Sequence, residues 1–389
     1  DTDGDDSEET SEEESGDVQQ TTMQGGNSPI EIPMVETVES LESAIKNLAK
    51  MDGIENRYLE IPDVDTSKII ISNERIHNLI DEHFASIDSF CTQIEELPYD
   101  QSDWKRMQMH SARNFMMQSN EDYVKFKREA QKEVNYLVKE FERRKSAGAY
   151  ARTTTSRTGI LDTKNLHTYK FNEDLFKKIN IVPDGKNHGL VFVLDWSGSM
   201  SREMLDTAKQ LYNLIWFCTK LQIPFEVYAF TQCFPNQDEV TGEMETSYEP
   251  KDGVFVVDRN FSLMNLFTSK VRGRKLDDQL KNLFTIVGSF SNYEAQKVVP
   301  LGMGLSGTPL NESIVALHKI IPQFRKENNV EKVNCVILTD GEAYPLHYHN
   351  EVRRDWEDEP YLGTRNVGSN CFLRNRKTGK TYKSGVHYS

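Results

Sequence analysis

The chain has 389 residues, long enough for two or three domains, with a formal net charge of -15 and 37% hydrophobic residues. Such an acidic balance argues against wholesale nucleic-acid binding, because phosphates would be repelled. No signal peptide and no apolar run long enough for a membrane span are visible, so we expect a cytoplasmic protein without a membrane segment.

The first seventeen residues, "DTDGDDSEETSEEESGD", hold ten acidic residues and no basic one. The segment "QQTTMQGGNSP" then continues this polar composition. Such a stretch buries too little apolar surface to offset the entropy lost on ordering. We therefore expect a disordered acidic linker over 1–35. It would act as a solvated tether or, alternatively, as an electrostatic contact for a basic partner.

A helical region is expected over 36–148. Apolar residues recur there every three or four positions, which predicts amphipathic helices. Asn73 is the expected N-cap of the second of these helices. The helical segments are 35–51, 73–90 and 120–150. The last segment places one apolar face at Tyr123, Phe126, Ala130, Val134, Leu137 and Phe141.

An extended connector is expected over 149–187, and from residue 188 onward short apolar runs alternate with helical patterns. This alternation predicts an α/β, Rossmann-like domain over 188–389, with a parallel sheet covered by helices on both faces. Strands of buried type are expected at 188–195, 224–230 and 332–340, and helices at 202–221 and 308–326, the latter bent near Pro322.

Two stretches depart from this alternation. The segment between Phe230 and Ser306 is interpreted as a long insertion, with a hairpin around Pro250–Gly253. A second hairpin is expected around Lys377–Gly379. No further strand–helix unit follows Asp340, so we expect the domain to be incomplete at its C-terminal end.

Two of the predicted strands end in aspartate, and hydroxyl groups accompany them. Asp195 ends the strand of "VFVLDWSGSM" and is followed by Ser197 and Ser199. Asp340 ends "VNCVILTD", and Thr308 precedes a helix in "SGTPLNE". The carboxyl ends of parallel strands share one edge of a sheet, so these residues are expected to converge there, with Asp195 facing solvent. An oxygen-only set favours a hard divalent cation, Mg²⁺ or Mn²⁺, over zinc.

This order, Asp-x-Ser-x-Ser and then Thr and Asp, resembles the metal-ion-dependent adhesion site (MIDAS) of von Willebrand factor A (VWA) domains. The resemblance implies that Asp195, Ser197, Ser199, Thr308 and Asp340 hold the cation, which takes a further carboxylate from a partner protein. A structural role is the alternative, because serines cap helices and a Thr-Pro pair commonly opens one.

The arrangement of the whole chain extends the resemblance. A helical charge-rich stretch, a connector with "GILDTKNL" and then "VFVLDWSGSM" are similar to the CobT subunit of aerobic cobaltochelatase, over roughly residues 110–345. The acidic segment upstream also resembles the acidic linker of that subunit. The shortened CobT-like proteins of tailed phages are the more similar group. The resemblance implies a non-catalytic subunit of an ATP-dependent, cobaltochelatase-like complex, in the host cytoplasm if a virus encodes it. Whether cobalt or cobalamin biosynthesis is involved stays open.

The partner implied by this resemblance is an AAA+ ATPase of the CobS or MoxR type, with an unidentified client protein and a possible homo-oligomeric ring. The chain itself has no GxxxxGK[ST] loop, so ATP hydrolysis is assigned to that partner. A stand-alone adhesion module is the first alternative. A zinc metallopeptidase using His347, His349 and Glu351 is the second, but the HExxH pattern is absent and two exposed loop histidines are the simpler interpretation.

The five cysteines are widely spaced and form no CxxC pair. We expect buried, reduced thiols. A zinc site or a disulfide framework is the alternative. The cysteines are Cys91, Cys218, Cys233, Cys335 and Cys371.

Overall fold

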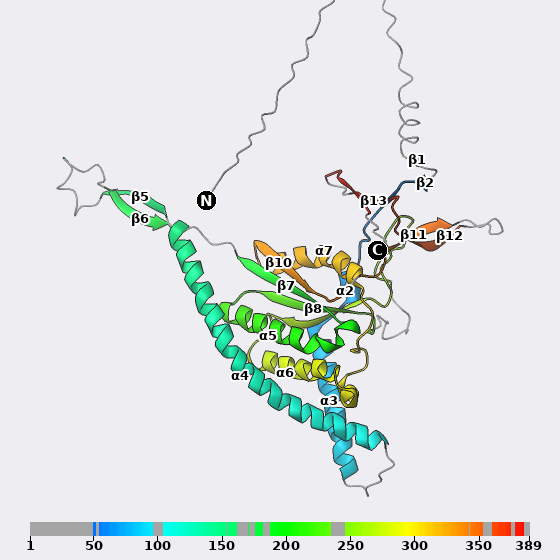
Figure 1. Ribbon diagram of the computed structural model, residues 1–389. Coiled ribbons are helices and arrows are strands. Elements are labelled where there is room, and N and C mark those ends of the chain that lie inside the picture. Colours follow the sequence, from blue (N-terminus) through cyan, green and yellow to red (C-terminus); the bar gives the residue numbers. More distant parts are fainter. Residues whose placement is uncertain are drawn as a thin grey trace, which may run out of the picture. The chain divides into compact units, whose positions relative to one another are not determined.

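The computed structural model describes residues 50–51, 54–95, 104–152, 154–161, 170, 176–181, 187–234, 246–341, 343–352, 360–374 and 378–384 (Figure 1). The chain divides into two compact units, Asp1–Glu55 and Asn56–Ser389. In the first unit, the described residues form the antiparallel pair β1 (Lys50–Met51) and β2 (Ile54–Glu55). The acidic linker expected over 1–35 and most of the helix predicted over 35–51 lie outside the described residues.

The second unit is mixed α/β, which confirms the predicted class. Its central sheet contains β4 (Ile70–Ile71), β7 (His188–Asp195), β8 (Phe225–Thr231), β9 (Ser262–Thr268) and β10 (Lys332–Leu338). The strand order is β10-β7-β8-β9-β4. β10, β7 and β8 run parallel, β9 is antiparallel to β8, and β4 is parallel to β9. The sheet is therefore mostly parallel and is compatible with a Rossmann-like fold.

Helices cover both faces of this sheet, as the alternation predicted. They are α2 (Thr66–Ile69), α3 (Asn73–Glu95), α4 (Trp104–Arg152), α5 (Met204–Leu221), α6 (Gly273–Ser289) and α7 (Leu310–Glu327). Phe192 and Leu194 of β7 pack with side chains of α3 to α6, whereas Val191 and Val193 pack with α7. Figure 1 shows α5 and α6 on one side of the sheet and α7 on the other. The alternation of side chains along β7 thus separates two hydrophobic clusters.

The described part of the segment 230–306, interpreted as an insertion, is packed into the core of the domain. It supplies β9 and α6, whose Met264 and Leu280 are buried in the same cluster as Phe192. Most side chains of β9 are buried, so its sequence does not alternate and gives no clear period. The hairpin predicted around Pro250–Gly253 is also wrong, because Val254 and Phe255 pair by single bridges with distant residues instead.

Within the helical region expected over 36–148, the described helices α3 and α4 share a hydrophobic core with the sheet. α4 contacts α5 and α6, α3 contacts β9, and β4 extends the sheet at the β9 edge. Tyr123, Ala130 and Val134 of α4 are buried as predicted, whereas Leu137 and Phe141 are 47% and 40% exposed. None of the described helices is long and apolar enough to cross a membrane.

Ser72 caps α3, and the prediction of Asn73 as its N-cap is wrong. The Ser72 hydroxyl accepts a hydrogen bond from the Arg75 N–H (3.3 Å), and the Ser72 carbonyl accepts one from the Ile76 N–H (3.1 Å). The Asn73 amide instead donates to the carbonyl oxygen of Leu266 in β9 (2.8 Å). Both residue types suit an N-cap, so the contact with β9 decides between them.

β10 was expected to be buried, but it alternates between covered and exposed positions. Val333, Cys335 and Ile337 pack toward α7, whereas Asn334 and Val336 are exposed. β10 ends the described sheet, and α7 covers only one of its faces. An apolar run alone does not reveal whether one face or both faces of a strand are covered.

The remaining strands form small sheets. β5 (Thr154–Leu161) and β6 (Phe176–Ile181) form an antiparallel pair within the expected connector. β11 (His347–Val352) pairs with β12 (Tyr361–Asn366). β13 (Cys371–Arg374) pairs antiparallel with β14 (Thr381–Lys383), which confirms the second predicted hairpin, and parallel with β3 (Arg57–Leu59).

Candidate metal site at the ends of β7 and β10

The carboxyl ends of β7 and β10 lie side by side where the chain changes direction across the sheet. From β7 the chain passes through α5 to β8 on one side, and it reaches β10 on the other side through α7. The two helices pack on opposite faces. Ligands of open α/β sheets bind in the crevice at such a switch point. The predicted cation site would therefore occupy the place that this topology favours.

Hydrogen bonds join four of the five predicted residues at this point. The Ser197 N–H donates to Asp195 Oδ1 (2.9 Å). The hydroxyl oxygens of Ser197 and Ser199 lie 2.9 Å apart, and the Ser199 hydroxyl donates to Asp340 Oδ1 (2.9 Å). The two strand ends thus meet through serine hydroxyls.

Thr339 also belongs to this cluster, although the sequence analysis did not select it. Its hydroxyl donates to Asp195 Oδ2 (2.6 Å) and accepts from the Gly341 N–H (3.2 Å). The pairing of Leu338 with Leu194 brings Thr339 beside Asp195. A parallel alignment of the two predicted strands is the signal that points to Thr339.

Thr308 is connected to the cluster only through its loop. Ser306, two residues earlier, pairs with Ser197 by a single bridge and accepts a hydrogen bond from the Gly198 N–H at its carbonyl oxygen (2.8 Å). In the part of the chain that the structure describes, no hydrogen bond links the Thr308 side chain to the other four predicted residues. The structure therefore brings four of the five together directly.

The two carboxylates differ in exposure. Asp340 is exposed, but Asp195 is 0% exposed, so the expectation that Asp195 faces solvent is wrong. Within the described ranges, neither carboxylate forms an ion pair with a basic side chain. A buried carboxylate requires compensation by hydrogen bonds or a cation. For Asp195, the Ser197 N–H and the Thr339 hydroxyl provide the hydrogen bonds. No ion pair with a described basic side chain supplies a positive charge.

Trp196 anchors the loop between Asp195 and Ser197. The indole is fully buried, its Nε1–H donates to the Met303 carbonyl oxygen (2.8 Å), and its ring lies edge-on to Phe290 at 5.4 Å between centroids. The residue that follows Asp195 thus ties this loop to the segment that carries Ser306. Such support limits the movement of site side chains.

The loop before α7 is packed tightly at Gly307. A Cβ atom there would lie 2.5 Å from Gln232 Oε1 and 2.6 Å from the Tyr344 hydroxyl. The Gln232 side chain also donates to Asp258 Oδ2 (2.9 Å).

Burial, with a smaller contribution from Asp258, raises the pKa of Glu312 in the first turn of α7. The surroundings of the loop are thus acidic.

The atoms that could coordinate a cation at the ends of β7 and β10 are all oxygen atoms, which suits Mg²⁺ or Mn²⁺. In the described ranges, the ends of β7 and β10 included, there is no group of three or more His, Cys, Asp or Glu residues arranged to hold a metal ion. His347 is exposed, but His349 lies buried on β11, with Nε2 2.8 Å from the Tyr248 hydroxyl. The interpretation as two exposed loop histidines is therefore wrong.

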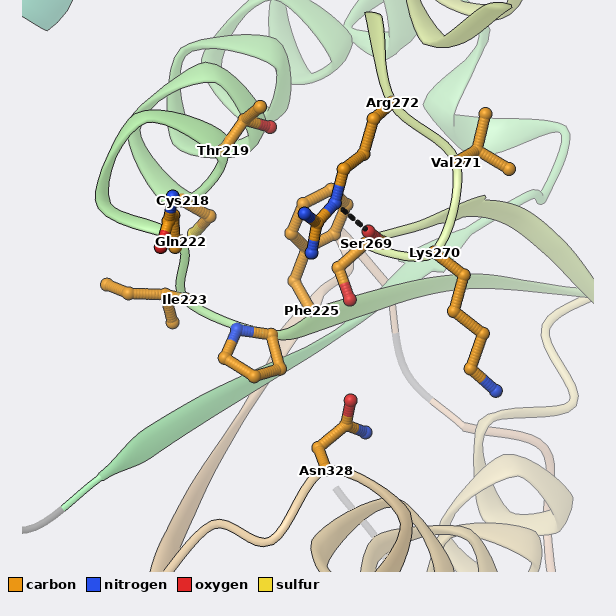
Figure 2. A pocket seen from close by; sticks show the side chains of 11 residues that line it. Cys218, Thr219, Gln222, Ile223, Phe225, Ser269, Lys270, Val271, Arg272 and Asn328 are labelled. Carbon is orange, nitrogen blue, oxygen red and sulfur yellow. Dashed lines mark hydrogen bonds between the residues drawn. The ribbon is translucent and has the colours of Figure 1, made fainter.

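A pocket of about 320 Å³ lies at the opposite ends of the strands and contains none of the predicted site residues (Figure 2). Arg272 Nε donates to the Ser269 carbonyl oxygen (3.3 Å), and Lys270 pairs with Glu327 (3.0 Å). Cys218 also lines it, and burial raises the pKa of this thiol to about 12, so it stays protonated at neutral pH.

The cysteines are buried or half-buried, and no disulfide joins any of the five, all of which lie in described segments.

Comparisons of the chain with protein-family models, characterised proteins and solved structures find no match.

Proposed function

We propose that the chain binds Mg²⁺ or Mn²⁺ at the ends of β7 and β10, in a VWA-like domain, and uses the ion to dock a partner protein. Asp195, Ser197, Ser199, Thr308 and Asp340 form the proposed ligand set. The observation that carries the proposal is the hydrogen-bonded, all-oxygen cluster at the switch point of the sheet.

The spacing of the oxygen atoms supports a small hard cation. An octahedral ion with bonds of about 2.1 Å places neighbouring ligand oxygens about 3 Å apart. The Ser197–Ser199 and Ser199–Asp340 oxygen pairs are each 2.9 Å apart. Both Asp195 oxygens accept hydrogen bonds, which orient this carboxylate, and each oxygen keeps a second lone pair for the cation. When bound, the ion supplies an electrophilic position for a carboxylate of the partner.

The partner we propose is an AAA+ ATPase of the CobS or MoxR type, with this chain as a CobT-like, non-catalytic subunit that couples the ATPase to a client. The order of the motifs along the chain supports this assignment. The packing of α4 on α5 and α6 adds a structural argument, because it gives the 49-residue helix a rigid connection to the sheet that carries the site. A client bound along α4 would move with the site.

Thermal unfolding with and without the metal tests the site itself. Saturating Mn²⁺ should raise the midpoint of the wild type, because a ligand at 100 times its Kd stabilises the folded state by about 2.7 kcal/mol. Asp340→Asn should lose this response. Glu331→Gln, which changes an exposed carboxylate outside the site, should keep it. An equal Mn²⁺ response in Asp340→Asn would contradict the proposed ligand set.

Pull-down of a candidate ATPase tests the docking. Binding should require Mg²⁺, fail in EDTA and fail with Asp340→Asn. A chain that binds Mn²⁺ but no ATPase would instead favour the stand-alone adhesion module. ATPase binding that persists in EDTA would place the docking surface elsewhere on the chain.

A further inference from the structure

The three-stranded sheet β14-β13-β3 has one buried face and one face that is open to solvent. Cys371 of β13 and Leu59 of β3 are 0% and 2% exposed and belong to one hydrophobic cluster. Neighbouring side chains of a strand point to opposite faces, so Phe372 and Tyr58 lie on the other side of the sheet. Tyr58 is 58% exposed, which shows that this second face is open.

The register of the three strands brings aromatic and basic side chains together on the open face. Phe372 pairs with Tyr58 of β3 and with Lys383 of β14. Directly paired residues lie on the same side of a sheet, so these three form one row across it. The Tyr58 and Phe372 rings are neighbours, with centroids 5.9 Å apart and planes tilted by 37°. Arg374 lies two residues after Phe372 and therefore on the same face.

The charged groups of the open face are available to a partner. Arg374 and Lys383 are exposed, and in the part of the chain that the structure describes neither forms an ion pair. Glu60, two residues after Tyr58, adds one negative charge. The face therefore combines two adjacent aromatic rings with a net positive charge.

The surrounding sequence is basic, although the chain as a whole is acidic. Residues 360–389 contain six Lys or Arg residues and no Asp or Glu, whereas the whole chain has a net charge of -15. The net charge argues against nucleic-acid contact over the whole surface, but it does not describe this region. Screening limits repulsion from carboxylates farther away than about 8 Å at physiological ionic strength. A polyanion is thus the complementary partner for this face.

We propose that the open face of β14-β13-β3 binds single-stranded nucleic acid. Unpaired bases stack on the rings of Tyr58 and Phe372, and Arg374 and Lys383 contact the phosphates beside them. The exposed rings favour nucleic acid over an acidic peptide, because carboxylates gain nothing from an aromatic face. Duplexes are disfavoured, because their bases already stack on one another. This surface includes no residue of the proposed metal site and needs no divalent cation.

The test is fluorescence anisotropy of labelled oligo-dT, labelled oligo-U and a duplex, titrated with the full chain in EDTA. The single strands should bind more tightly than the duplex, and their affinity should fall as the salt concentration rises. Tyr58→Ala should weaken single-strand binding about tenfold, because a stacked base loses its ring, whereas Tyr58→Phe should bind like the wild type. Tyr293→Ala, which removes an 81% exposed ring outside this sheet, should leave the affinity unchanged.

Lys383→Gln tests the phosphate contact while it keeps both rings. It should weaken single-strand binding and reduce the slope of log K against log salt by about 0.7, the value for one phosphate contact. Lys326→Gln, at an exposed lysine in the last turn of α7, should keep the slope. If Tyr58→Ala fails to fold, the slope of Lys383→Gln decides.

Three results would overturn the proposal. They are absence of single-strand binding, unchanged affinity in a folded Tyr58→Ala variant, and displacement of oligo-dT by an equal concentration of poly-glutamate. The last result would favour an acidic protein as the partner of this face. Tighter binding of oligo-U than of oligo-dT, or the reverse, would support the proposal and identify RNA or DNA as the ligand.

Discussion

Asp195 connects two strand ends through a single carboxylate. Its Oδ1 accepts from the Ser197 N–H in the loop after β7, and its Oδ2 accepts from the Thr339 hydroxyl after β10. Because the side chain is fully buried, these hydrogen bonds are shielded from water. The residue therefore contributes to stability as well as to the proposed cation site.

Replacement of Asp195 should separate these two roles. Asp195→Ala is expected to lower the free energy of unfolding by roughly 1–3 kcal/mol, because the buried Ser197 N–H loses its acceptor. Asp195→Asn keeps an acceptor for Ser197 and offers an amide donor to the Thr339 hydroxyl, so it should be closer to wild type. Urea unfolding measures both. Equal stability of wild type and Asp195→Ala would show that these hydrogen bonds make no net contribution to the free energy of unfolding.

Glu226 of β8 is a buried carboxylate outside the site. It is 6% exposed and accepts hydrogen bonds from Thr268 Oγ1 (2.7 Å) and Asn265 Nδ2 (2.8 Å). Burial nevertheless raises the pKa of Glu226 above its ordinary value of 4.5. The folded state thus binds this proton more tightly than the unfolded state. Its contribution to stability is largest below pH 4.5 and is lost as the pH rises through the folded pKa.

Glu226→Gln should therefore raise the free energy of unfolding at pH 7, by roughly 1 kcal/mol, and reduce its fall with increasing pH. Asn265 Oδ1, which is buried without a hydrogen bond, becomes an acceptor for the new amide once the Asn265 side chain turns over. Urea unfolding between pH 4 and 8 measures the effect. A variant less stable than wild type at pH 7 would show that the fold needs the charge of Glu226.

At the scale of elements, close packing joins β7 and α7. Phe324 of α7 and Val330 pack in the cluster that contains Val191 and Val193 of β7. Gly189 lies in β7 at this contact, where α7 crosses the strand. This close approach joins the start of β7 to the last turn of α7 and holds the helix against the sheet.

Gly189→Ala should disturb this contact. The added Cβ would lie 2.5 Å from Phe324 Cε1 and 3.2 Å from Val330 Cγ2, so the ring must move. Overpacking of this kind costs roughly 1–3 kcal/mol. Gly304→Ala is the matched control, since nothing lies within 4 Å of its Cβ position, and it should leave stability nearly unchanged. Thermal unfolding of both variants provides the comparison, and equal midpoints would contradict the close packing.

At the scale of the whole molecule, the unit from Asn56 to Ser389 is closed by contacts between distant parts of the chain. β3 pairs with β13, and Leu59 is buried with Phe255, Tyr348 and Cys371. β4 joins the central sheet beside β9. The residues that precede the strand–helix region are therefore needed to complete the domain.

Two deletions test this organisation. Removal of residues 1–30 should leave the thermal midpoint nearly unchanged, because this polar segment, which holds ten carboxylates at its start, has little apolar surface to bury. Removal of residues 1–60 should lower the midpoint, because β3 and Leu59 are lost. A large drop from the shorter deletion would show that the acidic segment packs on the rest of the chain.

The sequence by itself determined the features that depend on local pattern. β7, α5, β8 and α7 follow the predicted segments closely, because a continuous apolar run and a period of three to four residues are both local signals. The spacing of Asp195, Ser197 and Ser199, with Asp340 at the end of another strand, was sufficient to select four of the residues that the structure joins by hydrogen bonds.

Only the tertiary structure decided the features that depend on distant partners. β9 is buried on both faces, with Met264 in one hydrophobic cluster and Leu263 in the other, so its own residues show no clear period. The contact with Leu266 turns Asn73 away from the N-cap position, and the register with β10 brings Thr339 to Asp195. The burial of Asp195 follows from the same packing. Each of these outcomes depends on which groups meet after folding, and hydrogen bonds and burial between distant residues leave no periodic signal in the sequence.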